Sequence, residues 1–393
     1  MRHSKLSEAV RSSSLRARSL PRSAIREMMD LAVGRSGVIH LEVGESDAPT
    51  PEHIIQGAFE SAHAGWTKYS ANAGLPALRA LIARRMSSRW GTQVASDQVV
   101  VTTGAVGAVF TSIATVADAG DEILTPDPGW PNYEAMAHLL NVKVVRYDLH
   151  PRNGFLPDPD QISQRITGKT KAILINSPSN PAGGVFPEGL MARLADIARI
   201  SGVYLISDEI YEDIVFDGQH VSAGSLGISD RTFVISGFSK GYAMTGWRLG
   251  WLICAPELAL AATRIQEPLY SCASTISQKG GEVALLGPIS TTENFRNTYR
   301  RRRDIIVDVF RNTGMLSVVP AGGFYALIDI SRTGLLSLDF AKRFLLEHNV
   351  VTVPGSTFGP NCEKFVRVAL TIEDDQLRVG LLRLRAFITS LAQ

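Results

Sequence analysis

The sequence predicts an α/β protein with a mostly parallel sheet in a large domain and a second, smaller α+β domain. Short apolar runs alternate with helical patterns, and Gly, Pro, Asp or Ser residues bound each run. This alternation is typical of βαβ units, in which a helix connects two parallel strands. At 393 residues the chain is also longer than one hydrophobic core usually grows. The runs expected to form strands cover residues 99–101, 122–124, 142–145, 172–175, 204–206 and 233–235.

The smaller domain is expected because the pattern changes near Thr291. A long basic helix through Arg311 comes first, and the N-terminal segment, which also lies outside the alternating pattern, is assigned to the same domain. The further expected elements are strands near 324–330 and 365–370 and helices around 340–347 and 375–391. We therefore predict a large domain at 49–286 and a small domain formed by 1–48 and 287–393.

The composition favours a globular enzyme that acts on small molecules. Apolar residues make up 45% and charged residues 20% of the chain. The formal net charge is only +2 and the basic residues are dispersed, which argues against a nucleic-acid surface. No apolar run reaches the ~18 to 20 residues that span a bilayer. The three cysteines Cys254, Cys272 and Cys362 lack CxxC spacing and the histidines are scattered, so neither disulfides nor a metal site is expected.

These features indicate a cytoplasmic protein. The stretch from Arg2 to Arg26 is rich in Arg and Ser and has Glu8 as its only acid, as in an organellar transit peptide. No apolar face repeats there at helical spacing, however, so the cytoplasm is favoured.

Polar residues follow the ends of several predicted strands, where ligands bind in parallel sheets. Lys240 comes just after the run 233–236 and could hold an aldehyde through its amine. An arbitrary lysine is more often a solvated surface residue. Here Arg248 lies nearby among Trp247 and Leu249, and a buried arginine needs an anionic partner such as a phosphate. We therefore expect Arg248 to be buried and phosphate-bound, as in an enzyme that uses pyridoxal 5′-phosphate (PLP).

Asp208 stands at the end of the apolar run 204–206 and is expected to be buried. Beside a pyridinium N–H such a carboxylate would stay ionised and make the cofactor an electron sink. Tyr211 could then donate to the phenolate oxygen of the cofactor. Taken alone, Asp208 could equally be a helix N-cap.

Two loops complete this set of residues. The turn-forming residues 176–184 follow another strand and would present the amide of Asn180. Small residues at 104–107 join a strand to a helix whose free N–H groups could cradle a phosphate. The second signal is weak by itself, because small residues at such turns also serve close packing.

Taken together, these segments resemble the fold-type I PLP-dependent aminotransferases of class I, in the prokaryotic aspartate-aminotransferase-like branch. The resemblance covers nearly the whole chain and implies a homodimer with shared active sites. It includes further matches in order and approximate spacing at Gly-Glu-Ser-Asp 44–47, Lys-Tyr-Ser 68–70, Pro-Gly-Trp-Pro-Asn-Tyr 128–133, Pro-Ala-Gly-Gly-Phe-Tyr 320–325, Val-Pro-Gly 353–355 and Val-Arg-Val 366–368.

The resemblance implies a role for each candidate residue. Lys240 would form a Schiff base with PLP and later move the proton between Cα and C4′. Asp208 would pair with the pyridine nitrogen, and Tyr211 would contact the phenolate oxygen. The other residues implied to bind the cofactor are Tyr69 of the partner subunit, Gly104, Ala105, Val106, Trp130, Asn180, Ser239 and Arg248. The residues implied to bind substrate are Gly44, Trp130, Asn180 and Arg367, with Arg367 clamping the α-carboxylate.

The chain departs from the family pattern at several positions. Ser46 and Ala182 stand where Pro and Thr are usual. Gly237 replaces a serine that often binds phosphate, so either Ser236 or Ser239 is expected to substitute for it. Val106 stands where aspartate-using members carry a lysine that pairs with the distal carboxylate. This last change predicts that a neutral, apolar or aromatic donor is preferred to aspartate.

Two alternatives stay open at this point. One is a PLP-dependent lyase or other Cα chemistry on the same fold. The other is a serine hydrolase, because Gly-Phe-Ser-Lys-Gly at 237–241 satisfies the G-x-S-x-G pattern, and Asp329 and His348 follow Ser239 in the required order. A hydrolase would leave Lys240 without a role.

Overall fold

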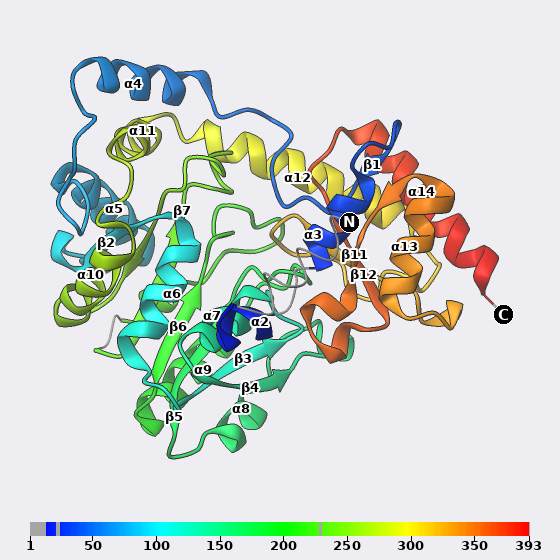
Figure 1. Cartoon of the computed structure of the whole chain (residues 1–393), viewed down its shortest axis with the longest axis horizontal. Helices are drawn as coiled ribbons and strands as arrows, with labels where there is room; N and C mark the ends of the chain where they lie inside the picture. Colours follow the sequence, from blue (N-terminus) through cyan, green and yellow to red (C-terminus); the bar gives the residue numbers. More distant parts are fainter. Residues whose placement is uncertain (1–12, 21–23, 228–229, 393) are drawn as a thin grey trace.

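The computed structural model describes residues 13–20, 24–227 and 230–392 (Figure 1). The stretch from Arg2 to Arg26 is therefore described only in part. Helices and strands alternate through the large sheet region, and the C-terminal helices and a smaller sheet lie beside it (Figure 1).

A seven-stranded sheet forms the centre of the larger region, in the order β2-β8-β7-β6-β5-β3-β4. The strands from β3 to β7 pair in parallel, whereas β8 is antiparallel to both β2 and β7. The expected strands are all present, and the sequence did not predict β8. The bounds are β2 Val99–Thr102, β3 Glu122–Asp127, β4 Lys143–Asp148, β5 Thr170–Asn176, β6 Tyr204–Asp208, β7 Thr232–Gly237 and β8 Gly250–Ile253.

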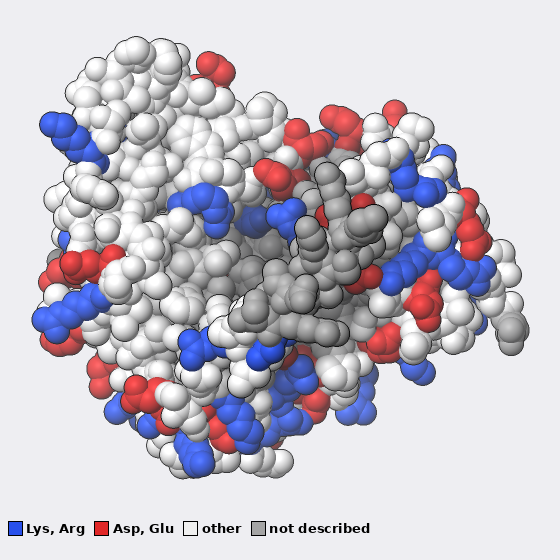
Figure 2. Space-filling model, in the orientation of Figure 1, with Lys and Arg blue, Asp and Glu red and all other residues white. Residues whose placement is uncertain are grey.

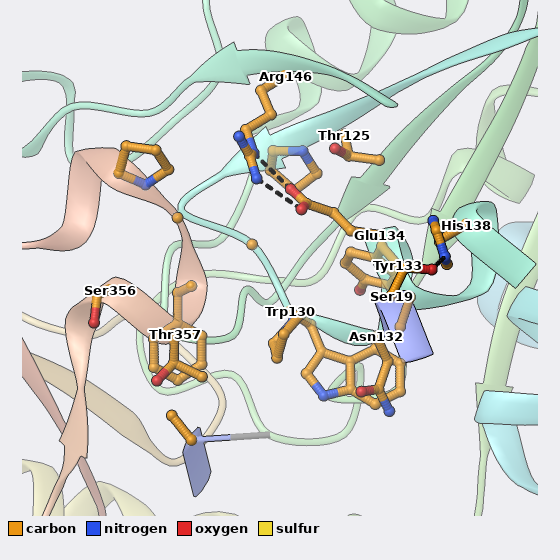
Figure 3. Close-up of a pocket in the computed structure, with 18 residues that line it drawn as sticks. Ser19, Thr125, Trp130, Asn132, Tyr133, Glu134, His138, Arg146, Ser356 and Thr357 are labelled. Carbon is orange, nitrogen blue, oxygen red and sulfur yellow. Dashed lines mark hydrogen bonds and ion pairs between the residues drawn. The ribbon is translucent and has the colours of Figure 1, made fainter. Parts of the chain in front are cut away.

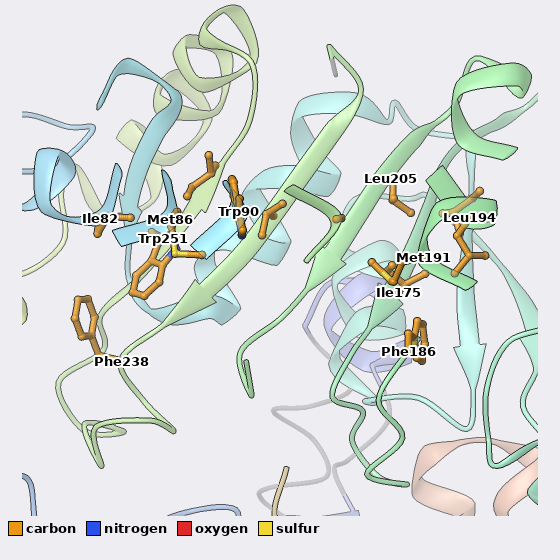
Figure 4. Packing of buried hydrophobic residues seen from close by; sticks show 14 of the residues in the cluster. Ile82, Met86, Trp90, Ile175, Phe186, Met191, Leu194, Leu205, Phe238 and Trp251 are labelled. Atoms are coloured by element: carbon orange, nitrogen blue, oxygen red, sulfur yellow. The ribbon is translucent and has the colours of Figure 1, made fainter. Parts of the chain in front are cut away.

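Helices cover both faces of this sheet, which explains why its strands are apolar throughout. Successive strand residues point to opposite faces. Ile175 and Leu205 pack into one core with Met191 of the covering helix α9 (Figure 4). Leu174 and Ile206 belong to the core on the other face. The helices are α4 Glu52–His63, α5 Pro76–Trp90, α6 Gly104–Val116, α7 Asn132–Leu139, α8 Pro159–Arg165, α9 Glu188–Ser201, α10 Pro256–Tyr270 and α11 Thr275–Leu286.

The C-terminal region has its own sheet and core. An antiparallel sheet in the order β11-β12-β9 packs with the predicted helices around a separate apolar cluster. Helix α12 leads into this region and lies against α14 (Figure 1). The bounds are α12 Ser290–Val309, β9 Tyr325–Asp329, α13 Ser337–His348, β10 Val350–Val351, β11 Val353–Pro354, β12 Phe365–Ala369 and α14 Asp374–Leu391.

The N-terminal segment joins this C-terminal region. Strand β1 (Ile39–His40) pairs in parallel with β10, and Met28 of helix α3 (Ala24–Ala32) packs against α13. A short helix, α2 (Leu15–Ser19), precedes them. The limits of the two domains at 48/49 and 286/287 stay predictions.

In the described part of the chain, we find no helix both long and apolar enough to cross a membrane. Positive and negative side chains are interspersed over the face shown in Figure 2.

Candidate active site

A cavity of about 410 Å³ lies at the carboxyl ends of the parallel strands, where the large sheet faces β12 and the N-terminal segment. Side chains from distant parts of the sequence line it together. Among the residues predicted from the sequence, those that line it are Gly44, Ala105, Val106, Trp130, Asn180, Asp208, Tyr211, Ser239, Lys240, Arg248 and Arg367.

Asp208 is a buried carboxylate at the end of β6. Its Oδ2 accepts a hydrogen bond from the Tyr133 hydroxyl at 2.7 Å, and its Oδ1 accepts one from the Ile210 amide at 3.2 Å. Burial raises the pKa of Asp208 to about 6, although both hydrogen bonds oppose this shift. A cationic group in the cavity would therefore be stabilised beside Asp208, because it would balance a charge that burial disfavours.

Lys240 lies just beyond β7 and points into the same cavity. Its Nζ donates a hydrogen bond of 2.6 Å to the carbonyl oxygen of Gly44. Burial lowers the pKa of Lys240, which favours the neutral amine that attacks an aldehyde. Gly44 has no room for a side chain, because a Cβ there would collide with the Tyr325 hydroxyl. The N-terminal segment therefore fixes the lysine through its backbone.

Tyr211 follows the same strand end as Asp208 and is 4% exposed. Burial and the neighbouring hydroxyl of Tyr325 raise the pKa of Tyr211 well above its usual value. Tyr211 therefore stays protonated and can donate a hydrogen bond.

Arg367, on β12, is a buried cation, and the nearby carboxylate of Glu42 acts on its charge. Its Nη2 donates to the Glu42 carbonyl oxygen at 2.6 Å and its Nη1 to Asn180 Oδ1 at 3.2 Å. Its guanidinium stacks 4.1 Å from the centre of the Tyr325 ring. Within the described residues Arg367 forms no ion pair and its Nε has no hydrogen-bond partner. Burial lowers its pKa, so an anion that enters the cavity would gain a strong, charge-assisted contact.

The part of the cavity that is expected to bind phosphate differs from the sequence prediction in the exposure of Arg248. Arg248 is exposed, not buried. Its backbone has a positive φ of 53°, which turns its side chain away from its apolar neighbours and across the start of α6. There its Nη2 lies 2.6 Å from where a Cβ on Gly104 would be, and the positive φ of 72° at Gly104 favours glycine at that position. Gly104 itself does not line the cavity, but α6 begins there without a side-chain cap, which leaves its first N–H groups free.

The structure distinguishes the two serines offered as substitutes at the phosphate position. Ser239 lines the cavity, whereas Ser236 turns away and donates to Glu212 Oε1 at 2.6 Å. Gly237 is needed for packing, because a Cβ there would lie 2.9 Å from Gly250 Cα on the adjacent strand.

Trp130 and Val106 border the outer part of the cavity. Trp130 meets the Tyr133 ring edge-on at 5.3 Å, and both also line a neighbouring cavity that holds the Glu134–Arg146 ion pair (Figure 3). Val106 is 37% exposed on the first turn of α6. The residues of that turn are themselves uncharged, and Arg248 is the cation beside it.

Besides Gly104, Tyr69 is a predicted site residue that does not line the cavity of one chain. It is 88% exposed and lies at a different surface depression, beside Cys272. Its assignment to a partner subunit's site stays a prediction.

Sequence reasoning missed several residues at the site. Tyr133 and Tyr325 occur in matched motifs, but nothing in their spacing indicated contacts with Asp208 or with Gly44 and Tyr211. Asn176 was not singled out either, although its Nδ2 donates to the Asp208 carbonyl oxygen at 2.9 Å. Helix α3 also borders the cavity, and no local signal indicated this.

The hydrolase residues do not meet. Asp329 Oδ1 caps the Ser331 amide, and the His348 ring packs on Phe344 and Phe387 in the C-terminal core. Neither Asp329 nor His348 lines the cavity that contains Ser239.

Comparison with known proteins agrees with this geometry. The family "Aminotransferase class I and II" matches residues 36–384, and the chain belongs to this family. It is accordingly a PLP-dependent transaminase with an α/β fold, whose substrates are amino acids and 2-oxo acids.

Relatives in this family differ in their named substrates. The chain is 35% identical to the aspartate/prephenate aminotransferase of Thermus thermophilus, over 90% of this chain and 92% of that protein. It is also 35% identical to aromatic-amino-acid aminotransferase 2 of Thermococcus litoralis, over 92% of this chain and 94% of that one. The solved structure of Thermus thermophilus aspartate aminotransferase with maleate is similar with a TM-score of 0.91 at 34% identity, covering 96% of this chain and 99% of that one.

The residues of the cavity fit PLP. The amine of Lys240, the buried carboxylate of Asp208, and the bare helix start beside Arg248 are the groups that an aldehyde, a pyridine nitrogen and a phosphate require. When bound, PLP supplies an electron sink for bonds at the substrate Cα.

Proposed function

We propose that this enzyme transfers an amino group from a neutral amino acid to a 2-oxo acid by a ping-pong mechanism. The carrying observation is that Arg367, a buried cation without an ion-pair partner among the described residues, faces Lys240 and Asp208 in one cavity. Such a cation has a place for the α-carboxylate of an amino acid, and the amine of Lys240 is close enough to the same space to act on the adjacent carbon.

Each residue has one part in this proposal. Lys240 holds the cofactor and moves the proton at the substrate Cα, and Asp208 keeps the pyridine nitrogen protonated. Tyr211 and Asn180 bind the phenolate oxygen, and Trp130 stacks on the ring. Phosphate is bound by Arg248, Ser239 and the amides of Gly104, Ala105 and Val106. Substrate carboxylate is bound by Arg367 with the backbone of Gly44.

The same proposal includes a homodimer in the cytoplasm, in which Tyr69 of each subunit completes the other's phosphate site. Its 88% exposure in one chain leaves its hydroxyl available to such a partner. The runner-up is a PLP-dependent lyase that uses the same residues, because both reactions begin with the same bound substrate.

The donor preference is proposed from Val106. A dicarboxylate would bring a second charge into the cavity, and a buried carboxylate without a partner is strongly disfavoured. Val106 supplies none, whereas an apolar substrate side chain gains about 0.8 kcal/mol for each methylene buried. We therefore rank leucine and phenylalanine above aspartate.

The test is kcat/KM for aspartate, leucine and phenylalanine in wild type, Val106→Lys and the size control Val106→Leu. Wild type is expected to prefer the neutral donors, and the lysine variant is expected to shift the ratio toward aspartate by about tenfold or more, as for a charge-assisted contact. The leucine variant should not move it. A wild type that strongly prefers aspartate, or a lysine variant with an unchanged ratio, would overturn the pocket assignment.

A further inference from the structure

A second buried carboxylate lies directly behind Asp208. Glu209 is the next residue in the chain and is 0% exposed, and it does not line the cavity that contains Asp208. Its Oε1 accepts hydrogen bonds from Ser207 Oγ at 2.7 Å and from the Ala223 amide at 2.9 Å. Its Oε2 lies 2.8 Å from His220 Nε2. The negative charge of Glu209 is therefore held in place on the side of Asp208 away from the cofactor site.

His220 is partly buried beside Glu209 and has no other hydrogen-bond partner among the described residues. Its side chain is 10% exposed, and its Nδ1 is buried and unpaired. Burial opposes the charged imidazolium, but the attraction of Glu209 outweighs it and raises the pKa of His220. The surroundings of this pair therefore favour the protonated form of His220.

His220 and Glu209 belong to a larger group of acidic and basic side chains behind the site. Arg89 of α5 contacts Glu212 at 2.9 Å, and Arg85 of the same helix contacts Asp213 at 2.8 Å. Three acidic and three basic side chains are thus gathered behind the site. The acids are Glu209, Glu212 and Asp213; the bases are Arg85, Arg89 and His220. Glu188, Glu293 and Arg296 also line the adjoining cavity.

We propose that His220 is a positioning residue for the reaction: by neutralising Glu209, it keeps the proton shared between Asp208 and the cofactor on the pyridine nitrogen. This inference rests on the proposed function of Asp208. Glu209 is the chain neighbour of Asp208, and its negative charge raises the pKa of the Asp208 carboxyl. An uncompensated Glu209 would therefore draw the shared proton onto the Asp208 carboxylate. The ring would then be neutral and a weaker electron sink.

The experiment uses holoenzyme reconstituted with PLP labelled with ¹⁵N in the ring. The variants are His220→Gln, Glu209→Gln and the double variant. In wild type the nitrogen signal should be that of a pyridinium. In His220→Gln the nitrogen signal should move toward that of neutral pyridine. We expect kcat to fall about tenfold with little change in KM, which corresponds to a fall of about one unit in the pKa of the ring nitrogen. In the double variant, which removes both charges, the pyridinium signal and kcat should return.

This rescue distinguishes charge compensation from a merely structural role, since a structural role makes the double variant at least as impaired as His220→Gln. A double variant that stays impaired, or a His220→Gln protein with an unchanged nitrogen signal, would overturn the inference. A wild type without pyridinium would instead overturn the role proposed for Asp208. If His220→Gln does not fold, a wild-type pH titration replaces it. The nitrogen should lose its proton as His220 does, and a double variant with the same step would contradict the inference.

Discussion

The two sheets each bring one buried charged group to the cavity, and they support it in different ways. Asp208 at the end of β6 receives hydrogen bonds from Tyr133 and Ile210, and a compensated ion cluster lies behind it. Among the described residues, Arg367 on β12 donates to a backbone carbonyl and an amide oxygen and lies against aromatic rings, and the nearby charge of Glu42 tends to raise its pKa. The cofactor side is thus already supported by its own protein partners. The substrate side keeps a charge without an ion pair among the described residues, so the carboxylate of a ligand would add a direct charged contact there.

The largest effect on kcat/KM is expected from Arg367→Lys, which tests whether Arg367 binds the substrate carboxylate. A lysine keeps the charge but loses the two-pronged geometry, and a hydrogen bond to a charged group contributes about 1.5–3 kcal/mol. We expect kcat/KM to fall about 10- to 100-fold for every amino acid while the visible absorbance of the bound cofactor is retained. The control is Arg303→Lys, a similarly buried arginine outside the cavity. Loss of the absorbance in Arg367→Lys would mean that Arg367 serves the cofactor instead.

A smaller effect is expected from Tyr133→Phe on the cofactor side. Asp208 loses a donor that stabilises its ionised form, so the pKa of Asp208 should rise further. We expect kcat to fall about tenfold with KM nearly unchanged, as for one lost hydrogen bond to a charged group. Tyr147→Phe is the matched control, because that buried hydroxyl donates to the Leu174 carbonyl oxygen at 2.9 Å, away from the cavity. Equal losses in both variants would assign Tyr133 a structural role only.

The smallest effect is expected on Tm, from the contact between Asp127 of the large sheet and Asn361 of the C-terminal region. Asp127 at the end of β3 accepts a hydrogen bond of 3.2 Å from the Asn361 amide, and burial raises its pKa from 3.8 to about 6. A carboxyl group whose pKa is raised by folding stabilises the protein below its unfolded pKa, and this stabilisation is lost as the pH rises to about 6. Asp127→Asn lacks this titration. The difference in Tm between Asp127→Asn and wild type should therefore change by roughly 2 °C in favour of the variant when the pH is raised from 4 to 7. A Tm difference that is the same at both pH values would contradict this account.

The sequence could predict that several residues meet in one cavity because they follow strand ends. Asp208, Lys240 and Asn180 each follow an apolar run after one to four intervening residues. Parallel strands bring such ends to one edge of the sheet. The three lie together as expected. Local pattern is sufficient for this, since the strand order does not alter the edge at which they meet.

The errors have a different physical origin. Arg248 was expected to be buried because its neighbours are apolar, but a positive φ of 53° redirects its side chain. Strand β8 was missed because its apolar run follows the Lys240 motif without an intervening helix. The contact of Tyr325 with Gly44 depends on packing between segments that lie far apart in sequence, and no spacing rule reports such packing.

The central claim is that Lys240 and Arg367 together carry out transamination, and a half-reaction tests it most directly. Wild-type protein, supplied with leucine or phenylalanine and no 2-oxo acid, should lose its visible absorbance and release one equivalent of 2-oxo acid per subunit. Adding a 2-oxo acid should restore the absorbance, and Lys240→Ala should show neither change. Continuous release of product and ammonia beyond one equivalent would instead indicate a lyase, and a colourless wild type with Ser239-dependent esterase activity would contradict the account altogether.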